Sequence, residues 1–433
     1  MIPVIRHTLQ RALRMLARRV VFRYHPTVIG VTGSVGKTSS VQAIALVLGS
    51  LDSLRVSPKN YNNELGVPLA VLDQESGLRS PLRWLTVLWD GIRQGWGARR
   101  RYPARLVLEL GVDKPQDMAY LVEFLQPKIA VVTAVSAVHL ATMKTVAAVA
   151  AEKGRLVAAL PADGTAVLNA DEPLAAAMAK KTKARVITYG MSEGALLRAV
   201  GVRTTYGTDA EGRLHGGIAC TVQYKEEIAP LSLPNVLGEA ILYAPLAGIA
   251  VGVAEGMRLR DAVAAASPYQ PPPGRSRLVP GIKRSAIIDD SYNSSPSAAA
   301  AAVRLLDSVP SRDGQKFAVL GDMLELGRIA GRAHRELGAL VATSRTDILV
   351  AVGELSRDIA RGAREAGMPE ERVFTFPDAA TAGRFLQDRL EPGDVLLVKG
   401  SQGVRMERVV KELMAEPQRA QELLVRQGPE WPR

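Results

Sequence analysis

Apolar residues recur along this chain at two spacings, one typical of amphipathic helices and one typical of buried strands. A helical stripe with arginines between its members comes first: Ile5, Leu9, Leu13, Leu16 and Val20. It predicts a basic amphipathic helix over residues 3–23, ended by His25-Pro26. Short apolar runs then alternate with alanine-rich helical segments, including one over 37–48, which is typical of a mostly parallel sheet. The predicted strands are 27–31, 106–110, 129–135, 166–169 and 185–189.

A stiff proline-rich segment, Pro271–Gly274, separates this pattern from a second one. Beyond it the alternation restarts, with helices expected from Ser297 and over 332–342. The strands expected there are 286–289, 317–320, 348–352, 372–376 and 395–398. We therefore predict an α/β protein with these parts: a helix at 1–26, a central domain at 27–270, a linker at 271–274 and a second α/β domain at 275–433. The polar end, from about Ala415, is expected to fray.

Charge and composition narrow the function classes. The first 51 residues hold six arginines, one lysine and no acidic residue, which is +7 of a total net charge of +12. An excess this local indicates an anionic partner at the N-terminus and argues against a nucleic-acid-binding protein. Cys220 is the only cysteine, so disulfide scaffolds and cysteine-based zinc sites are excluded and a reducing, cytoplasmic compartment is expected. No apolar run is long enough to predict a spanning helix.

A glycine-rich segment, Gly33–Thr38, follows a predicted strand and opens a predicted helix. Backbone N–H groups in such a loop cradle phosphates, the lysine reaches the terminal phosphates and the threonine hydroxyl binds Mg²⁺. Val31 stands where the strict phosphate-loop pattern has glycine, so the alternative is a glycine turn that caps an ordinary helix. Glu109, at the end of the strand 106–110, is the carboxylate available for the metal; alternatively it is a solvated strand end.

An ordered series of motifs resembles the Mur ligases, ATP-dependent amide-forming enzymes of bacterial cell-wall assembly, and within them the ligases that add D-alanyl-D-alanine. In the first part of the chain the series comprises TGSVGKT at 32–38, NYNNELGVP at 60–68, ELG at 109–111, Thr133 to Leu140, EKG at 152–154 and LNAD at 168–171. In the second part it comprises PGR at 273–275, DDSYNSSP at 289–296, LGDMLELG at 320–327 with His334, and VKGS at 398–401. The resemblance implies a central phosphate-loop ATPase domain with a mostly parallel sheet and a C-terminal Rossmann-like α/β domain.

The resemblance also implies a mechanism and a set of site residues. ATP would phosphorylate a carboxylate of a muramoyl peptide, and an amine such as that of D-alanyl-D-alanine would then displace phosphate. The catalytic residues implied are Lys37, Lys153, His139 and Arg275. Those that would contact ATP are Gly33, Ser34, Val35, Gly36, Lys37, Thr38, Asn235, Arg275 and Asp290. Two Mg²⁺ ions would be held by Thr38, Glu109, His139 and a carbamoylated Lys153, and the substrates by Asn60, Asn63, Asn293 and Lys399.

Several alternatives stay open. Lys153 could be a surface lysine, and His139 a buried histidine without a metal. The sequence departs from the family at Ala134, Pro234 and Ser295, where asparagine or histidine is usual. Only 29 residues precede Gly30, too few for the family's uridine-binding domain, so the acceptor is either recognised by another route or carried differently. The alternative functions are a ligase for another polymer or a poly-amino-acid, and a nucleotide-binding subunit without activity.

The basic N-terminal helix suggests two interpretations. Its apolar stripe and arginines are typical of a helix that lies on an anionic membrane, which would place the protein at the inner face of the membrane. Residues 82–101 add Trp84, Trp89 and Trp96 among further arginines. In the other interpretation, the stripe packs on the ATPase domain and the arginines are solvated.

Overall fold

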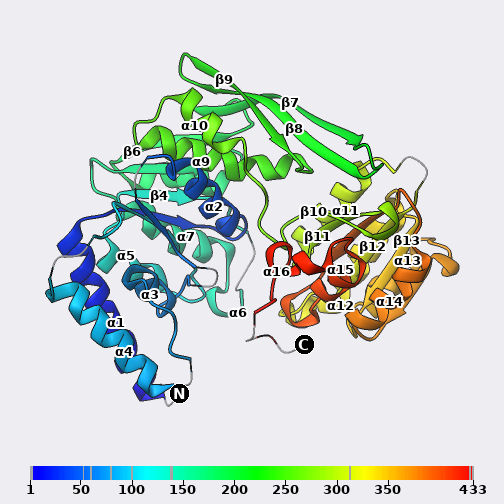
Figure 1. The fold of residues 1–433 in the computed structure, drawn as a ribbon, viewed down its shortest axis with the longest axis horizontal. Helices are drawn as coiled ribbons and strands as arrows, with labels where there is room; N and C mark the ends of the chain where they lie inside the picture. The colour runs from blue at the N-terminus through cyan, green and yellow to red at the C-terminus, as the bar shows by residue number, and fades with distance from the viewer. Residues whose placement is uncertain are drawn as a thin grey trace. The chain divides into compact units, whose positions relative to one another are not determined.

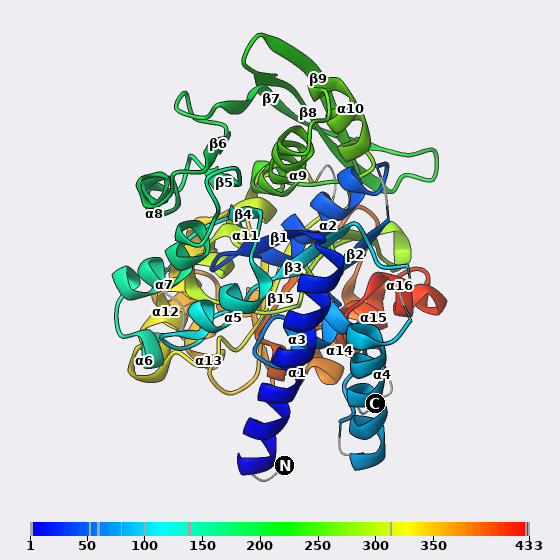
Figure 2. The ribbon, with the colours of Figure 1, turned by 90° about the vertical axis from the view of Figure 1, so that its left-hand side faces the viewer.

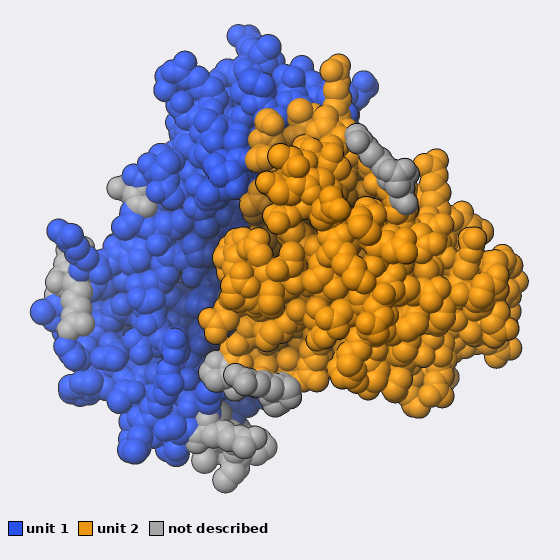
Figure 3. All heavy atoms as spheres, turned by 45° about the vertical axis from the view of Figure 1, so that its right-hand side comes forward, with its two compact units in different colours: residues 1–202, 220–231, 242–269 blue, residues 203–219, 232–241, 270–433 orange. Residues whose placement is uncertain are grey.

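The computed structural model describes residues 3–51, 53–58, 61–78, 80–98, 101–136, 140–311, 314–428 and 431. The chain divides into two compact units, which Figure 3 colours separately. The first unit comprises residues 1–202, 220–231 and 242–269, and the second comprises 203–219, 232–241 and 270–433. Within the described residues, no helix is long and apolar enough to cross a membrane.

One sheet has the strand order β2-β3-β1-β4-β5-β6-β7-β8-β9, and its strands β1 to β6 belong to the first unit (Figure 1). The pairs from β2 to β7 are parallel. The strands are β1 (Thr27–Thr32), β2 (Leu54–Val56), β3 (Arg105–Glu109), β4 (Ile129–Val132), β5 (Thr165–Asn169), β6 (Arg185–Gly190), β7 (Leu197–Thr208), β8 (Leu214–Tyr224) and β9 (Glu227–Pro234). The last three continue the sheet beyond the strands that the sequence predicts.

Helices cover both faces of the parallel part of this sheet, as its continuous apolar strands require. The helices are α1 (Pro3–Tyr24), α2 (Lys37–Leu48), α3 (Gly66–Leu72), α4 (Pro81–Trp96), α5 (Asp117–Leu125), α6 (Leu140–Met143), α7 (Val146–Ala158), α8 (Pro173–Ala176), α9 (Tyr243–Ala254) and α10 (Leu259–Ala266). Helices α2, α9 and α10 pack together, whereas α1, α3, α5 and α7 share the core formed with alternate residues of β3 and β4.

The apolar stripe of α1 faces this core. Leu9, Leu13, Leu16 and Val20 are all buried, packed with residues of α3 and α5. These four members of the stripe therefore pack on the first unit and do not contact lipid, whereas the side chain of Ile5 lies outside the description. The expectation of solvated arginines is wrong for Arg6 and Arg14, which form ion pairs with Glu64 and Glu123. The periodicity identifies the apolar face of the helix, but the neighbouring helices decide what covers it.

The second unit contains a six-stranded sheet in the order β10-β11-β15-β12-β13-β14, parallel except for β10. The strands are β10 (Arg277–Pro280), β11 (Ala286–Asp290), β12 (Lys316–Gly321), β13 (Ile348–Val352), β14 (Val373–Phe376) and β15 (Val395–Lys399). Its helices are α11 (Pro296–Ser308), α12 (Ala330–Thr343), α13 (Arg357–Glu365), α14 (Ala379–Arg389), α15 (Glu407–Leu413) and α16 (Ala420–Leu423). Helices α11 to α13 share one core and α14 to α16 share the other.

The C-terminal segment is packed, not frayed. Leu423 and Leu424 are buried in the core with α14 and α15. The Arg426 guanidinium is almost fully buried and forms an ion pair with Glu407 at 2.8 Å. The expectation of a frayed end is therefore wrong over these residues, because the polar composition of the segment conceals the few apolar residues that anchor it.

Candidate functional site

The glycine-rich loop joins β1 to α2. Gly33 and Gly36 have φ angles of +154° and +86°, and α2 begins at Lys37. A Cβ on Gly33 would lie 1.9 Å from Thr133 Oγ1, so only glycine fits there. The Thr133 hydroxyl donates to the Val35 carbonyl at 2.6 Å, which holds the loop against the end of β4. The loop therefore presents backbone N–H groups at a helix N-terminus, the arrangement that binds phosphate.

A hydroxyl and a carboxylate meet at the start of α2. Thr38 Oγ1 donates to Glu109 Oε2 at 2.8 Å, and Asn62 Nδ2 donates to Glu109 Oε1 at 3.0 Å. The backbone N–H of Glu109 donates to Ser57 Oγ at 2.9 Å, and the Glu109 side chain is buried. Hydroxyl and carboxylate oxygens beside a phosphate-binding loop are ligands that suit Mg²⁺.

Two lysines converge on one carbonyl of the loop. Lys37 Nζ and Lys153 Nζ each donate to the Gly33 carbonyl at 2.9 Å. Lys153 lies on α7 and its side chain is 1% exposed, so it is not a surface lysine. Burial, with a further contribution from the positive charge of Lys37, lowers the pKa of Lys153 to about 7. Both effects favour the neutral amine over the ammonium at this position.

Some residues proposed for the site cannot be placed. His139 and Asn60 lie outside the described residues. Over the parts of the chain that the structure describes, no three His, Cys, Asp or Glu side chains gather into a metal-binding group. Within those parts, the candidate metal ligands beside the loop are Thr38 and Glu109.

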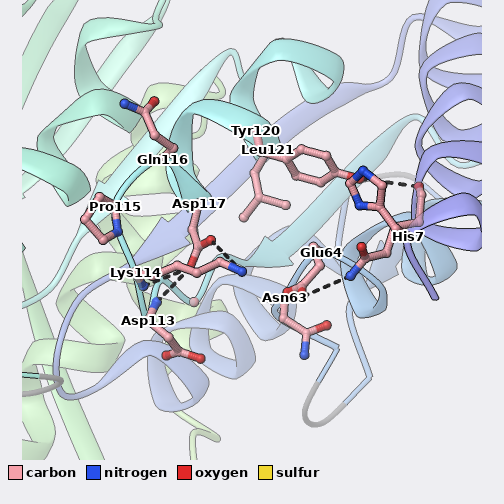
Figure 4. Close-up of a pocket in the computed structure, with 12 residues that line it drawn as sticks. His7, Asn63, Glu64, Asp113, Lys114, Pro115, Gln116, Asp117, Tyr120 and Leu121 are labelled. Carbon is pink, nitrogen blue, oxygen red and sulfur yellow. Dashed lines mark hydrogen bonds and ion pairs between the residues drawn. The ribbon is translucent and has the colours of Figure 1, made fainter. Parts of the chain in front are cut away.

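A pocket of about 280 Å³ lies beside the C-terminal end of β3 (Figure 4). Residues from α1, from the segment before α3 and from the start of α5 line it: His7, Gln10, Asn63, Glu64, Gly111, Asp113, Lys114, Pro115, Gln116, Asp117, Tyr120 and Leu121. Asn63 Oδ1 accepts from the backbone N–H of Gly66 at 2.9 Å and so also supports the start of α3. Gly111, which lines the pocket, donates its backbone N–H at 2.7 Å to the carbonyl of Asn62, the residue whose side chain holds Glu109, so the pocket lies near the Thr38–Glu109 pair.

Sequence reasoning missed Asn62. It selected Asn60 and Asn63 from the same asparagine-rich segment, whereas Asn62 is the residue that holds the Glu109 carboxylate. The sequence does mark this segment as a candidate for polar contacts, because three of the four residues 60–63 are asparagines. Only the fold shows which of them points at β3.

The second unit holds another group of the predicted residues. Lys399 Nζ donates to Asp290 Oδ2 at 2.7 Å and to the Asn293 carbonyl at 2.9 Å. Asp290 Oδ1 accepts from the backbone N–H of Ser276 at 3.1 Å. The Lys399 side chain is almost fully buried. Lys399 and Asp290, for which the resemblance implies separate ligands, are thus each other's partners at the ends of β15 and β11.

Arg275 follows the proline-rich linker and stacks on an aromatic ring. Its guanidinium carbon lies 4.0 Å from the centre of the Tyr292 ring, and Arg426 lies 5.6 Å from the same ring. The backbone N–H of Gly274 donates to Asp289 Oδ2 at 3.0 Å. Burial raises the pKa of Asp289 to about 6. The linker end is therefore fastened to the loop that follows β11.

Asn235 lies just after β9, within the second unit. Its φ angle is +57°, and its backbone N–H donates to the Gly216 carbonyl at 2.7 Å. Its side chain is exposed. The predicted residues thus form two groups, one around the phosphate loop in the first unit and one around the start of the second.

Comparisons with known proteins agree with these features. Residues 98–252 match a family model described as the Mur ligase middle domain, and residues 274–402 match one described as the Mur ligase glutamate ligase domain. A Mycobacterium bovis protein named UDP-N-acetylmuramoyl-tripeptide–D-alanyl-D-alanine ligase is 30% identical over 418 residues, which cover 90% of this chain and 73% of that protein. A Bacillus subtilis protein of the same name is 28% identical over 406 residues, which cover 94% of this chain and 80% of that protein.

Solved structures share the fold. A crystal structure of MurF from Acinetobacter baumannii aligns with a TM-score of 0.76 at 23% identity, covering 93% of this chain and 79% of that one. MurF from Thermotoga maritima, solved in complex with ADP, aligns with a TM-score of 0.73 at 24% identity, covering 93% and 83%. The α/β architecture with parallel sheets is therefore confirmed.

Proposed function

Because the chain belongs to the Mur ligase family, we propose that it is an ATP-dependent ligase that joins a carboxyl group of a muramoyl peptide to the amine of D-alanyl-D-alanine or a similar dipeptide. One observation carries the proposal. The phosphate loop is complete in geometry, with Lys37 at the helix start and Thr38 bonded to the Glu109 carboxylate. An inactive nucleotide-binding subunit would need the loop but would have no need for the second, buried lysine that contacts it.

The proposed ligation has two steps. A carboxylate oxygen of the acceptor attacks the γ-phosphorus of ATP, the bond to the bridging oxygen breaks, and ADP leaves. The donor amine then attacks the carbonyl of the acyl phosphate, and the carbon–oxygen bond to phosphate breaks. Inorganic phosphate leaves with one former carboxylate oxygen, and the amine loses a proton. Most catalysis in such a reaction comes from positioning and charge stabilisation.

Different residues around the phosphate loop would bind phosphate, metal and acceptor. The N–H groups of 33–38 and the Lys37 ammonium bind phosphate oxygens. Thr38 and Glu109 would hold Mg²⁺, with Asn62 fixing the carboxylate. When bound, the metal neutralises phosphate charge and favours attack by the carboxylate. The pocket beside β3 would receive the acceptor peptide, because Asn63 lines it and Gly111 connects it to Asn62 and so to the Glu109 carboxylate.

We propose that Lys153 works as a carbamate. Its neutral amine attacks CO₂, a nitrogen–carbon bond forms and one proton is released. Burial and the nearby Lys37 support this step, since both disfavour an ammonium at this position. The product replaces the buried amine with a carbamate, whose two oxygens share one negative charge and are suited to a second Mg²⁺ together with His139. Lys153→Ala should be inactive, with partial rescue by short-chain carboxylates.

Further contacts with ATP are proposed for residues of the second unit. Arg275, whose guanidinium lies over the Tyr292 ring, is proposed to reach the γ-phosphate. Asp290 is proposed for the ribose and Asn235 for the adenine. Asn293 and Lys399 are proposed near the incoming substrate, with Lys399 acting through its bond to Asp290.

Partners and compartment follow from this chemistry. ATP and the muramoyl peptide are small-molecule partners, and no role in nucleic-acid binding is proposed. The single, buried cysteine and the use of ATP support a cytoplasmic location.

The test is phosphate release measured across a panel of muramoyl peptides and amine donors. Phosphate release should require both substrates and should match the amide product in amount. Glu109→Gln should lower turnover by about 10²-fold or more, because one charged metal ligand is lost. Lys180→Ala, which changes an exposed lysine of the same unit, should leave turnover unchanged. Phosphate release that ignores the donor would contradict the proposal.

A further inference from the structure

Helix α4 presents an apolar seam to solvent. The seam comprises Leu82, Leu85, Trp89, Ile92 and Trp96. These residues recur at intervals of three and four, which places them along one side of the helix. All five are exposed, Leu82 by 75% and Trp89 by 62%. The buried residues of α4, including Val87, Gly91 and Gly95, lie on another side. A continuous exposed seam of this kind marks an interaction surface.

Helix α1 lies alongside α4 (Figure 2). A Cβ on Gly91 would meet Leu16 at 2.9 Å, and Arg19 Nε donates to the Gly95 carbonyl at 3.3 Å. Arg23 Nη2 donates to the Gly97 carbonyl at 2.7 Å. The contacts advance along both helices in the same direction, so the pair runs parallel. The two glycines let the helices approach closely and fix α4 to the core.

The outward side of α1 combines positive charge with apolar groups. Arg11, Met15, Arg18 and Phe22 recur at helical spacing on the side opposite the buried stripe. Met15 is 59% exposed and Phe22 is 62% exposed. Arg11 and Arg18 are exposed and form no ion pair with any described residue. An exposed helix face that mixes arginine with large apolar side chains is typical of a helix that lies in a membrane interface.

Most of the other arginines on the pair are already engaged. Arg6 pairs with Glu64, Arg14 with Glu123, Arg83 with Glu75, and Arg93 lies 3.9 Å from Asp90. Arg19 lies over the Trp96 ring at 5.3 Å. The charge left for a partner is therefore positive, and α1 contains no acidic residue. A second copy of the chain would bring the same uncompensated arginines together, which disfavours self-association through this surface.

We propose that the outward sides of α1 and α4 form a docking face for an anionic lipid surface. The seam of α4 inserts Leu85 and Trp89 at the level of the headgroups, where tryptophan is favoured. Arg11 and Arg18 meet the lipid phosphates. The proposal does not depend on the ligase activity, because none of these residues belongs to the phosphate loop or to its neighbours.

Co-sedimentation of the full chain with vesicles tests the docking face. The vesicles contain phosphatidylglycerol and phosphatidylcholine in equal parts, or phosphatidylcholine alone. At low salt the chain should sediment with the anionic vesicles and not with the neutral ones. Binding should fall steeply at about 0.5 M salt, where the screening length is roughly 4 Å. Absence of binding to anionic vesicles at low salt would overturn the proposal, as would equal binding to both kinds.

Three variants locate the surface. Leu85→Glu/Trp89→Glu should weaken binding by at least about tenfold, because it removes the inserting groups. Arg11→Glu/Arg18→Glu should also weaken it by at least about tenfold, since each lost arginine contributes roughly fivefold. Ile228→Glu, at an exposed apolar residue of β9, should bind as the wild type does. Unchanged binding by either double variant would overturn the proposal.

Two further measurements keep the outcome decisive. Thermal melting should show that each variant retains the wild-type fold; if Leu85→Glu/Trp89→Glu does not, Trp89→Ser takes its place. Tryptophan emission of the wild type should shift to shorter wavelength on anionic vesicles. Sedimentation velocity that shows a dimer lost in Leu85→Glu/Trp89→Glu, without vesicle binding by the wild type, would identify a self-association surface instead.

Discussion

Replacing Lys153 by methionine should stabilise the first unit below pH 7 while removing activity. Methionine keeps the length of the buried side chain but carries no charge. In the wild type the folded state must hold an ammonium away from water and close to Lys37, which also donates to the Gly33 carbonyl. Burying this charge lowers the free energy of unfolding of the wild type, and Lys153→Met carries no charge to bury.

The magnitude and its sign follow from the pKa of Lys153. Folding lowers this pKa from 10.5 to about 7. Between those values the unfolded chain binds more protons than the folded one, so the stability of the wild type rises with pH. The full difference amounts to about 5 kcal/mol in the free energy of unfolding. The cost is complete below pH 7 and disappears as the pH approaches 10.5.

Urea denaturation in CO₂-free buffer at several pH values between 6 and about 10 measures this difference. The stability of the wild type relative to Lys153→Met should increase across the range by several kcal/mol. Lys180→Met, at an exposed lysine, should track the wild type. Parallel curves for the wild type and Lys153→Met would refute the reasoning. With ¹³C-bicarbonate, a carbamate signal should appear in the wild type and not in Lys153→Met.

The remaining predictions concern both units. Lys37→Ala should lower phosphate release by about 10²-fold or more, because a positive charge that binds phosphate is lost. Its melting temperature should not change, since Lys37 begins α2 and its side chain is not part of the core. Turnover equal to that of the wild type would contradict the proposed ATP site. Asn62→Ala should raise the Mg²⁺ concentration needed for half-maximal activity by about tenfold, because Glu109 loses its orienting partner. In the wild type, the free energy of unfolding should fall by about 3 kcal/mol between pH 4 and 6, because folding raises the pKa of Asp289 from 3.8 to about 6 and the unfolded carboxyl releases its proton first. Asp289→Asn should not show this fall in urea denaturation, and an equal fall in both proteins would contradict the prediction. Arg426→Ala should destabilise the second unit by about 1.5–3 kcal/mol in urea denaturation, because it removes one of the two arginines that pair with the buried Glu407 carboxylate.

The sequence predicts the elements well where short-range patterns decide them. The helix expected over 37–48 is found at Lys37–Leu48, because the glycine loop fixes its start. The strand expected over 129–135 ends earlier, at Val132. Residues 133–136 leave the sheet to brace the loop through Thr133, which is a long-range contact that no local pattern encodes.

The sequence predicts the site less completely, since side-chain partners depend on the fold. Nothing in the spacing shows that Asn62 holds Glu109 or that Lys399 pairs with Asp290. The depressed pKa of Lys153 depends on burial by α7 and on the position of Lys37, which are both tertiary features. Which surface the apolar stripe of α1 contacts likewise depends on the positions of α3 and α5, which the sequence does not predict.

The most direct test of the proposed reaction follows an oxygen atom of the acceptor. A muramoyl peptide with an ¹⁸O-labelled terminal carboxylate is incubated with ATP, Mg²⁺ and D-alanyl-D-alanine, and the released phosphate is analysed by mass spectrometry. An acyl-phosphate route predicts that each phosphate released carries one oxygen from the carboxylate, and that Lys37→Ala releases none. Amide product formed together with unlabelled phosphate would contradict the route.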